Sequence, residues 1–376
     1  MSKRTAILGL TVIVAVAATL VVLLRPKERT SKQDIYIASI IPLTGPAAEF
    51  GPYNLQACEL FVEDYNSEHQ GKRRVRHAFQ DSKSLPKDGV SAAQAILLGE
   101  PPAAIQVQLS AVSMAVAPVA AEKHVLLFTI AGTGGPKGIH KLAFRNYPDP
   151  VLTAKETARV FLKDKPSSRV AILRINDEFG LSVGAAFRDQ LAEMNVPLAA
   201  DETFEKTATD FRAPVTKVLG GTPTTVYLVG FGNPLGRIIA QLRQLGFKGD
   251  ILGGPEVAFA DVLGTAKDAA EGVRFLDLAF DPRSPQEPTR SFVERYQQRY
   301  GRPPSAVSAV AYDGWSLILA AMERAGSTEP DKVATELLKI TAFQGVCGTI
   351  SVSPDRDVVY PLVPRVVQEG KPVLQR

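Results

Sequence analysis

The sequence predicts an α/β protein with two doubly wound parallel-sheet lobes. Short apolar segments alternate with amphipathic ones twice along the chain, and each series is typical of a parallel sheet covered by helices on both faces. The segment FRNYPDP (144–150) separates the two series, and its prolines and asparagine are typical of a crossover between domains. The 376 residues are enough for two domains of ordinary size.

The first series begins with the β-branched segment IYIASII and contains four apolar segments of strand length. Predicted strands are 35–41, 73–81, 103–109 and 125–129, and predicted helices are 53–68, 86–99 and 113–123. A glycine-rich segment, TIAGTGGPKG (129–138), follows the last strand. Its spacing fits neither a dinucleotide loop, because Gly138 comes one residue late, nor a P-loop, because Pro136 precedes Lys137 and no hydroxyl follows.

The second series begins with a helix and repeats the same alternation. Its predicted helices are 152–164, 181–194, 210–220 and 233–246, and its predicted strands are 169–175, 197–204, 224–230 and 250–254. A closing block follows, with predicted helices at 288–301, 305–326 and 331–339 and strand-like segments at 348–353 and 358–367.

The first 33 residues have the pattern of a secretory signal or an N-terminal membrane anchor with a linker. Residues 6–24 carry no charge, lie between basic residues, and are long enough to span a bilayer core. Ala15-Val16-Ala17 has the small-x-small form of a cleavage site, but the apolar run continues to Leu24. We therefore favour an uncleaved transmembrane helix over a signal peptide. Under either interpretation the body of the protein is exported, to the periplasmic or extracellular face of the inner membrane.

The basic excess lies in the N-terminal segment. The whole chain has a net charge of +4, yet residues 1–33 contain six basic residues and one acidic residue, which leaves the remainder at −1. A nearly neutral body lacks the basic surface on which nucleic-acid binding depends, so we expect no nucleic-acid partner.

The residues whose side chains could act in catalysis or bind a metal form no recognisable pattern. The four histidines lack zinc-site spacing and no nucleophile elbow occurs, so we expect no enzyme, no metal and no cofactor. Cys58 and Cys347 could pair in an oxidising compartment, but each lies in an apolar pattern, which favours two separate buried thiols. Asp177 and Glu178 are interpreted as a solvated loop end. Ser110 is interpreted as a helix N-cap, a position that can also face an anion.

In open parallel sheets, ligands bind beyond the carboxyl ends of the strands. The segments that follow strands here would line one cleft if the two lobes face each other, as in a ligand trap that closes by hinge motion. These segments are 42–52, 110–113, 129–135, 176–180, 230–233 and 254–257.

Five segments together carry a family resemblance over about nine-tenths of the chain. They are IPLTGPAAEFGPYNLQACELFVEDYN, SAVSMAVAPVAAEKHVLLFTIAGT, RVAILRINDEFG, GFKGDILGGPEV and FQGVCGTISVSPDRD. With these segments, residues 34–370 resemble the type I periplasmic binding proteins of branched-chain amino-acid transporters, the leucine/isoleucine/valine-binding family. The resemblance implies a monomer whose lobes are joined by three crossovers, near residues 147, 278 and 353. Lobe 1 would comprise 34–147 plus 279–352, and lobe 2 would comprise 148–278 plus 353–376.

The resemblance also implies a binding site for an amino acid. Ser110 and Thr133 match the residues that hold the ligand carboxylate in that family, and the Gly132 carbonyl and Glu256 match those that hold its ammonium group. The remaining matches line or close the cleft, and they are Phe50, Phe179, Phe231 and Gly232. Phe179 stands where the family often has tyrosine, so the ligand's side chain is not predicted.

The function that the resemblance implies is that of an extracytoplasmic solute-binding protein. It would capture an amino acid or a similar small carboxylate by hinge closure and pass it to the permease subunits of an ABC importer. The alternative is a membrane-anchored sensing module that works with a signalling receptor, which an uncleaved anchor would suit.

Overall fold

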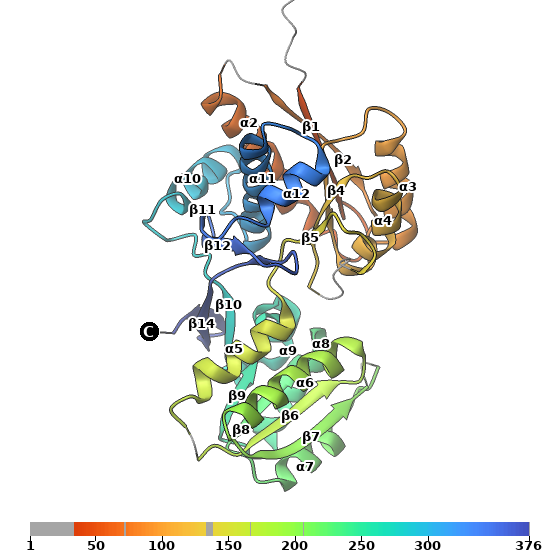
Figure 1. Cartoon of the computed structure of the whole chain (residues 1–376). Coiled ribbons are helices and arrows are strands. Elements are labelled where there is room, and N and C mark those ends of the chain that lie inside the picture. Colours follow the sequence, from red (N-terminus) through yellow and green to blue (C-terminus); the bar gives the residue numbers. More distant parts are fainter. Residues whose placement is uncertain (1–33, 71–72, 133–137, 166, 206, 376) are drawn as a thin grey trace, which may run out of the picture.

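The computed structural model describes residues 34–375 apart from 71–72, 133–137, 166 and 206. These residues form two lobes, one above the other, joined by a narrow waist (Figure 1). Each lobe has its own β-sheet with helices on both faces, which confirms the predicted two-lobe α/β fold; the upper sheet is parallel, and the lower sheet is parallel except for an antiparallel hairpin at one edge.

The upper lobe contains a five-stranded, fully parallel sheet in the order β2-β1-β3-β4-β5. Its strands are β1 (Ile35–Ile41), β2 (Val75–Asp81), β3 (Ala104–Gln108), β4 (Leu126–Ile130) and β5 (Ala143–Arg145). Its helices are α2 (Gly51–Glu68), α3 (Pro86–Leu97), α4 (Ser110–Glu122), α10 (Thr289–Tyr300), α11 (Ala306–Ala325) and α12 (Pro330–Leu337). A small antiparallel sheet, β11 (Phe343–Gly345), β12 (Gly348–Val352) and β13 (Val358–Val359), lies beside it.

Successive side chains of the upper sheet enter two separate cores, as the period of a strand requires. Ile37 and Phe128 pack in the core that includes α2 and α11, whereas Ala38 and Leu127 pack in the core that includes α3 and α4. The strands are therefore buried on both faces, which explains their continuous apolar sequence.

The lower lobe contains a seven-stranded sheet in the order β15-β14-β10-β9-β8-β6-β7. Its strands are β6 (Val170–Ile175), β7 (Leu198–Phe204), β8 (Thr225–Val229), β9 (Asp250–Gly253), β10 (Arg274–Leu278), β14 (Leu362–Gln368) and β15 (Lys371–Leu374). Helices α5 (Pro150–Leu162) and α6 (Glu178–Glu193) cover one face. The other face is covered by α7 (Arg212–Gly220), α8 (Gly232–Gln244) and α9 (Ala260–Ala266), with the short 3₁₀ helices η2 (Pro255–Ala258) and η3 (Lys267–Ala270).

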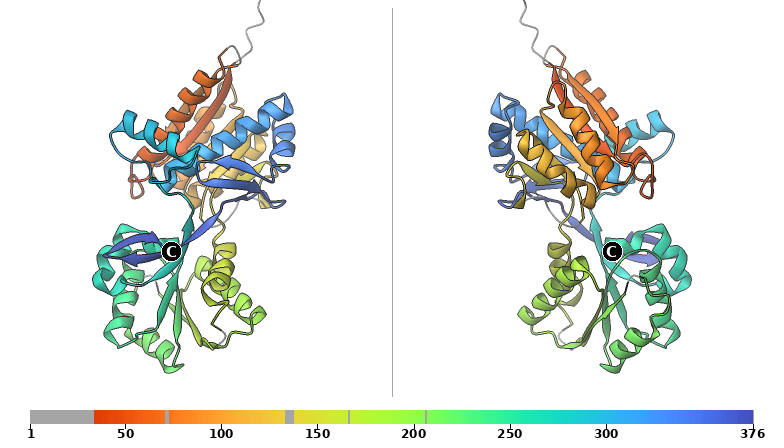
Figure 2. Two further views of the ribbon diagram at one scale, coloured as in Figure 1. Left: turned by 90° about the vertical axis from the view of Figure 1, so that its left-hand side faces the viewer. Right: turned by 90° about the vertical axis from the view of Figure 1, so that its right-hand side faces the viewer.

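The chain passes between the lobes at residues 146–149, 278–280 and 360–362. The third crossover differs from the position near 353 that the sequence suggested, because β13 still pairs with β12 and Tyr360 packs in the upper core. The predicted strand 358–367 is therefore divided at Pro361 between two sheets. In both side views the hairpin β14–β15, in dark blue, lies in the lower lobe (Figure 2).

Several elements escaped the sequence analysis, namely β5, β10, β11, β15 and the short helices η2, α9 and η3. Cys58 and Cys347 are separate buried thiols, as the sequence favoured. No helix among the described residues is both long and apolar enough to cross a membrane. The predicted anchor at 6–24 lies outside those residues.

The packing of α6 leads to a stability prediction. The Phe187 ring is fully buried and stacks on Tyr227 with 3.7 Å between ring centroids. Replacing Phe187 with alanine should therefore lower the free energy of unfolding by about 3–5 kcal/mol. Leu181 lies on the same helix, but 48% of its surface is exposed. Leu181→Ala should therefore change the free energy of unfolding by less than about 1 kcal/mol. Denaturant unfolding followed by circular dichroism measures both, and equal effects would contradict the packing described.

Candidate ligand-binding site

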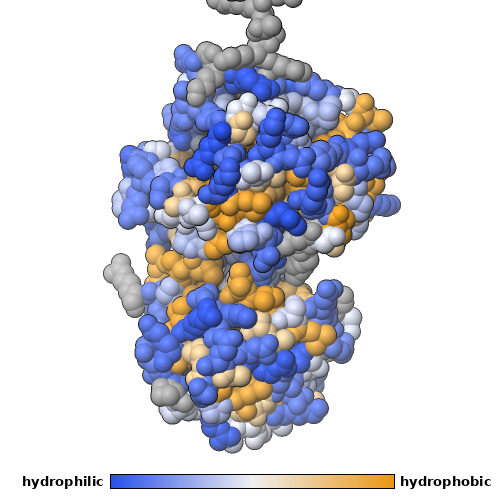
Figure 3. Space-filling model, viewed as in Figure 1, coloured by the Kyte–Doolittle hydropathy of each residue, from blue (hydrophilic) through white to orange (hydrophobic). Residues whose placement is uncertain are grey.

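A cavity of about 520 Å³ lies between the lobes, where the carboxyl ends of both sheets meet. The space-filling view shows apolar surface on both sides of the waist (Figure 3). The upper lobe contributes Ser110, Ala111, Met114, Gly132 and Arg145, and the lower lobe and first crossover contribute Asp149, Pro150, Val151, Asp177, Glu178, Phe179, Ser182, Val183 and Phe231. This size is typical of a site for a small molecule.

The upper wall is built around the start of α4. Ser110 is the first residue of that helix, and Leu109 before it has a φ of +79°, which is unusual for a residue with a side chain. The interpretation of Ser110 as the N-cap was therefore wrong by one position, because the chain turns into the helix at Leu109. The hydroxyl-bearing residue still lies at the helix N-terminus, where backbone N–H groups and the helix dipole favour negative charge.

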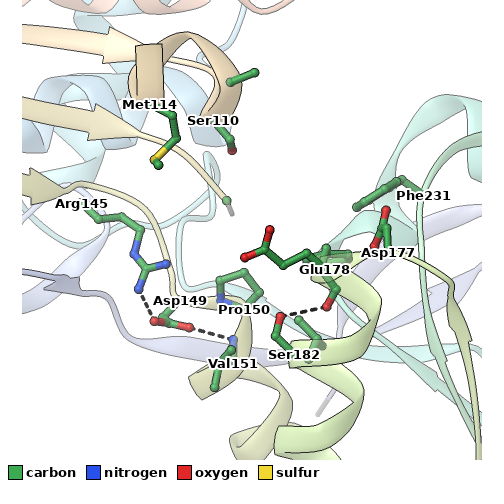
Figure 4. Close-up of a pocket in the computed structure, with 14 residues that line it drawn as sticks. Ser110, Met114, Arg145, Asp149, Pro150, Val151, Asp177, Glu178, Ser182 and Phe231 are labelled. Atoms are coloured by element: carbon green, nitrogen blue, oxygen red, sulfur yellow. Dashed lines mark hydrogen bonds and ion pairs between the residues drawn. The ribbon is translucent and has the colours of Figure 1, made fainter. Parts of the chain in front are cut away.

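The lower wall is built around the start of α6. The Asp177 carboxylate caps this helix by accepting the backbone N–H of Gly180 at 2.9 Å. Glu178 extends from the first turn into the cavity (Figure 4). The interpretation of these two residues as a solvated loop end was incomplete, because both line the cavity. Beside them the rings of Phe179 and Phe231 stack with centroids 4.8 Å apart and form an apolar surface.

Glu256 lies in η2, in a small recess of about 30 Å³ that adjoins the cavity and shares Gly132 and Phe179 with it. Its carboxylate lies so close to Gly254 that a side chain at position 254 would collide with it. Burial raises the pKa of Glu256 to about 7, and the nearby carboxylate of Asp277 raises it further. A cation in the recess would therefore favour the ionised form of Glu256.

Arg145 and Asp149 form a third part of the wall, which the sequence analysis missed. The buried Arg145 guanidinium donates from Nε to Asp357 at 2.9 Å and forms an ion pair through Nη2 with Asp149 (Figure 4). Asp149 also caps α5 by accepting the backbone N–H of Val151 at 2.7 Å. The one sequence signal was the Asp-Pro pair at the start of a predicted helix, which is typical of an N-cap.

The structure brings five of the eight predicted site residues to these two cavities. Ser110 and Phe231 line the larger one, Glu256 lines the smaller one, and Gly132 and Phe179 line both. Phe50 is the N-cap residue of α2 and Gly232 starts α8 with a φ of +66°, and neither lines these cavities. Thr133 lies outside the described residues.

Two facing α/β lobes around one cavity, joined by three crossovers, define a two-lobe solute-binding protein. The profile described as "periplasmic binding protein" matches residues 34–368. The chain therefore belongs to the periplasmic binding protein family. Members of this family are solute-binding proteins that act outside the cytoplasm, and they are not enzymes. The expectation that this protein is no enzyme is therefore confirmed.

The relatives narrow the family to the branched-chain amino-acid type. Leu/Ile/Val-binding protein homolog 3 of Brucella melitensis is 27% identical over 333 residues, which cover 87% of this chain and 89% of that protein. The leucine binding protein LivK of Thermotoga maritima is 26% identical, with a TM-score of 0.75 over 91% of this chain and 98% of its own. LivJ of Streptococcus pneumoniae, solved with isoleucine, has 21% identity and a TM-score of 0.73 over 90% and 98% of the two chains, a likeness of fold.

The raised pKa of Glu256 predicts a pH-dependent effect on stability. An unfolded chain loses this proton near pH 4.3, whereas the folded protein keeps it until about pH 7. Ionisation in the folded state is therefore penalised, and the penalty is complete only above pH 7. In the ligand-free protein, Glu256→Gln should raise the melting temperature relative to wild type more at pH 8 than at pH 5. A difference that is equal at both pH values would contradict the burial of this carboxyl.

Proposed function

We propose that this protein captures a small α-amino acid, or a similar carboxylate, between its lobes and delivers it to the permease of an ABC importer. The observation that carries the proposal is the opposite polarity of the two walls. The upper wall presents the N-terminus of α4 with Ser110, which suits a carboxylate, and the lower wall presents Glu256, which suits an ammonium group.

The predicted ligand contacts fit this polarity. Ser110, with Thr133 from the adjacent loop, would hold the carboxylate, and the Gly132 carbonyl with Glu256 would hold the ammonium group. A carboxyl whose pKa is raised by burial is costly to ionise alone, and a ligand cation would offset that cost. Phe179 and Phe231 would cover the apolar part of the ligand, while Phe50 and Gly232 would act at the rim.

Capture would depend on hinge motion at the three crossovers. A ligand that contacts both walls stabilises only the arrangement in which both walls reach it, so binding shifts the protein toward the closed state. We further propose that residues 6–24 tether the protein to the inner membrane and that it acts as a monomer next to its permease.

A thermal-shift screen of the full-length protein, purified in a mild detergent, tests the ligand class. The screen compares amino acids with small amides and with carboxylic acids that lack an ammonium group. A true ligand at 100 times its dissociation constant should add about 2.7 kcal/mol of stability. The assignment fails if no amino acid shifts the melting temperature while a solute without the ammonium group does.

The role of Glu256 predicts that amino-acid affinity falls at acid pH. An ammonium group is paired by the ionised carboxylate, so with a pKa of about 7 the binding-competent form of Glu256 is depleted below neutrality. Between pH 7.5 and pH 5.5 the affinity should fall by roughly tenfold or more, and binding at pH 6 should release a proton to the buffer. Calorimetric titrations in buffers of different ionisation enthalpy measure both quantities.

The matched variant is Glu256→Gln, which keeps the shape of the side chain without its charge. It should bind amino acids more weakly at pH 7.5 and should lose both the pH dependence and the proton release. Retention of either property in this variant would remove Glu256 from the ammonium site.

A further inference from the structure

Glu178 is an exposed acidic side chain of the cavity wall, and no residue that the structure describes pairs with it. Asp177 accepts the backbone N–H of Gly180, and Asp149 is held by Arg145 and by the start of α5. Among the described residues, no hydrogen bond or ion pair engages the Glu178 side chain. Figure 4 shows its carboxylate extending from α6 into the space beneath Ser110.

Among the residues of the cavity wall that the structure describes, no cation is available to Glu178. Arg145 is the single basic side chain among the described residues of the wall, and its charge is shared between Asp149 and Asp357. With Asp149, Asp177 and Glu178 against Arg145, the wall carries an excess of negative charge before Glu256 is considered.

Hinge closure would make the lack of a cationic partner for Glu178 energetically costly. When the upper wall approaches α6, water leaves the space around Glu178, and a carboxylate that loses water without gaining a cation is costly. An aliphatic side chain on the ligand would impose that cost, whereas a cationic side chain would remove it. A site built to pair with a charged group of its ligand rejects ligands that lack this group.

We infer that the ligand is an α-amino acid whose side chain ends in a cationic group, and that Glu178 pairs with this group. The inference rests on the proposed function, because it takes the amino-acid head group to lie between Ser110 and Glu256. It departs from the leucine-binding relative and the relative solved with isoleucine, because an aliphatic side chain would leave Glu178 unpaired. Asp149 and Ser182, further along the wall, add oxygen atoms that can accept hydrogen bonds from such a ligand.

Calorimetric titration of the full-length protein with matched ligand pairs tests the inference. The pairs are lysine with norleucine, ornithine with norvaline, and arginine with citrulline, each differing mainly in the terminal charge. At least one cationic member should bind about tenfold or more tightly than its neutral partner, as expected for a hydrogen-bonded charge pair. Glu178→Gln should reduce that preference to within about threefold, because it weakens the cationic member and removes the cost of desolvating a carboxylate beside the neutral one.

Glu193→Gln is the matched control, because Glu193 is an exposed residue at the other end of α6. About 22 Å separates the two positions along the helix, so this variant should keep the full preference. Both variants should melt at the wild-type temperature without ligand, which shows that the fold is intact.

The inference is overturned if neutral and cationic members bind equally, or if Glu178→Gln retains the preference. If neutral amino acids bind and Glu256→Gln weakens them without any preference for cations, the proposed function survives and this inference fails. If no amino acid binds, both fail together.

Discussion

The buried guanidinium of Arg145 joins the two lobes at the point where the chain first crosses between them. It pairs with Asp149, which caps the first helix of the lower lobe, and with Asp357, on the segment that leads to the third crossover. A buried cation is tolerated only when its charge and its N–H groups are met, so removing either aspartate would be strongly destabilising. This constraint fixes the start of α5 relative to the upper sheet, and with it one side of the cavity.

The cavity depends on that arrangement because neither lobe provides a complete site. The upper lobe supplies a helix N-terminus and the backbone after β4, and the lower lobe supplies the carboxylates and the aromatic pair. Each wall favours one sign of charge, so a ligand that carries both signs, as we propose, would be held well only when the walls meet. The same geometry explains why two neighbouring carboxylates of the cavity wall differ in their contacts. Asp177 caps α6, whereas no described residue engages the side chain of Glu178 in the next position.

Strands with long apolar runs could be predicted because their sequence carries the signal of burial on both faces. The segments 169–175 and 224–230 correspond to β6 and β8 within a residue or two. Short or partly polar elements carried no such signal. The strand β5 has three residues, and β10 contains Arg274 and Asp277, whose charges are met by Asp250 and Arg365. The break at Pro361 was also missed, because both halves of 358–367 have the composition of a strand.

The sequence by itself determined the two-lobe α/β fold, the family, and several of the residues that lie at the cavity, because periodicity and loop motifs are local properties. Only the tertiary structure decided how those residues are used. It placed Ser110 inside the helix start, engaged Asp177 as a cap, buried Glu256 beside Asp277, and brought Arg145 to Asp357 from 212 positions away in the chain. Partnership and burial set the energy of a charged group, and both depend on neighbours that are distant in sequence.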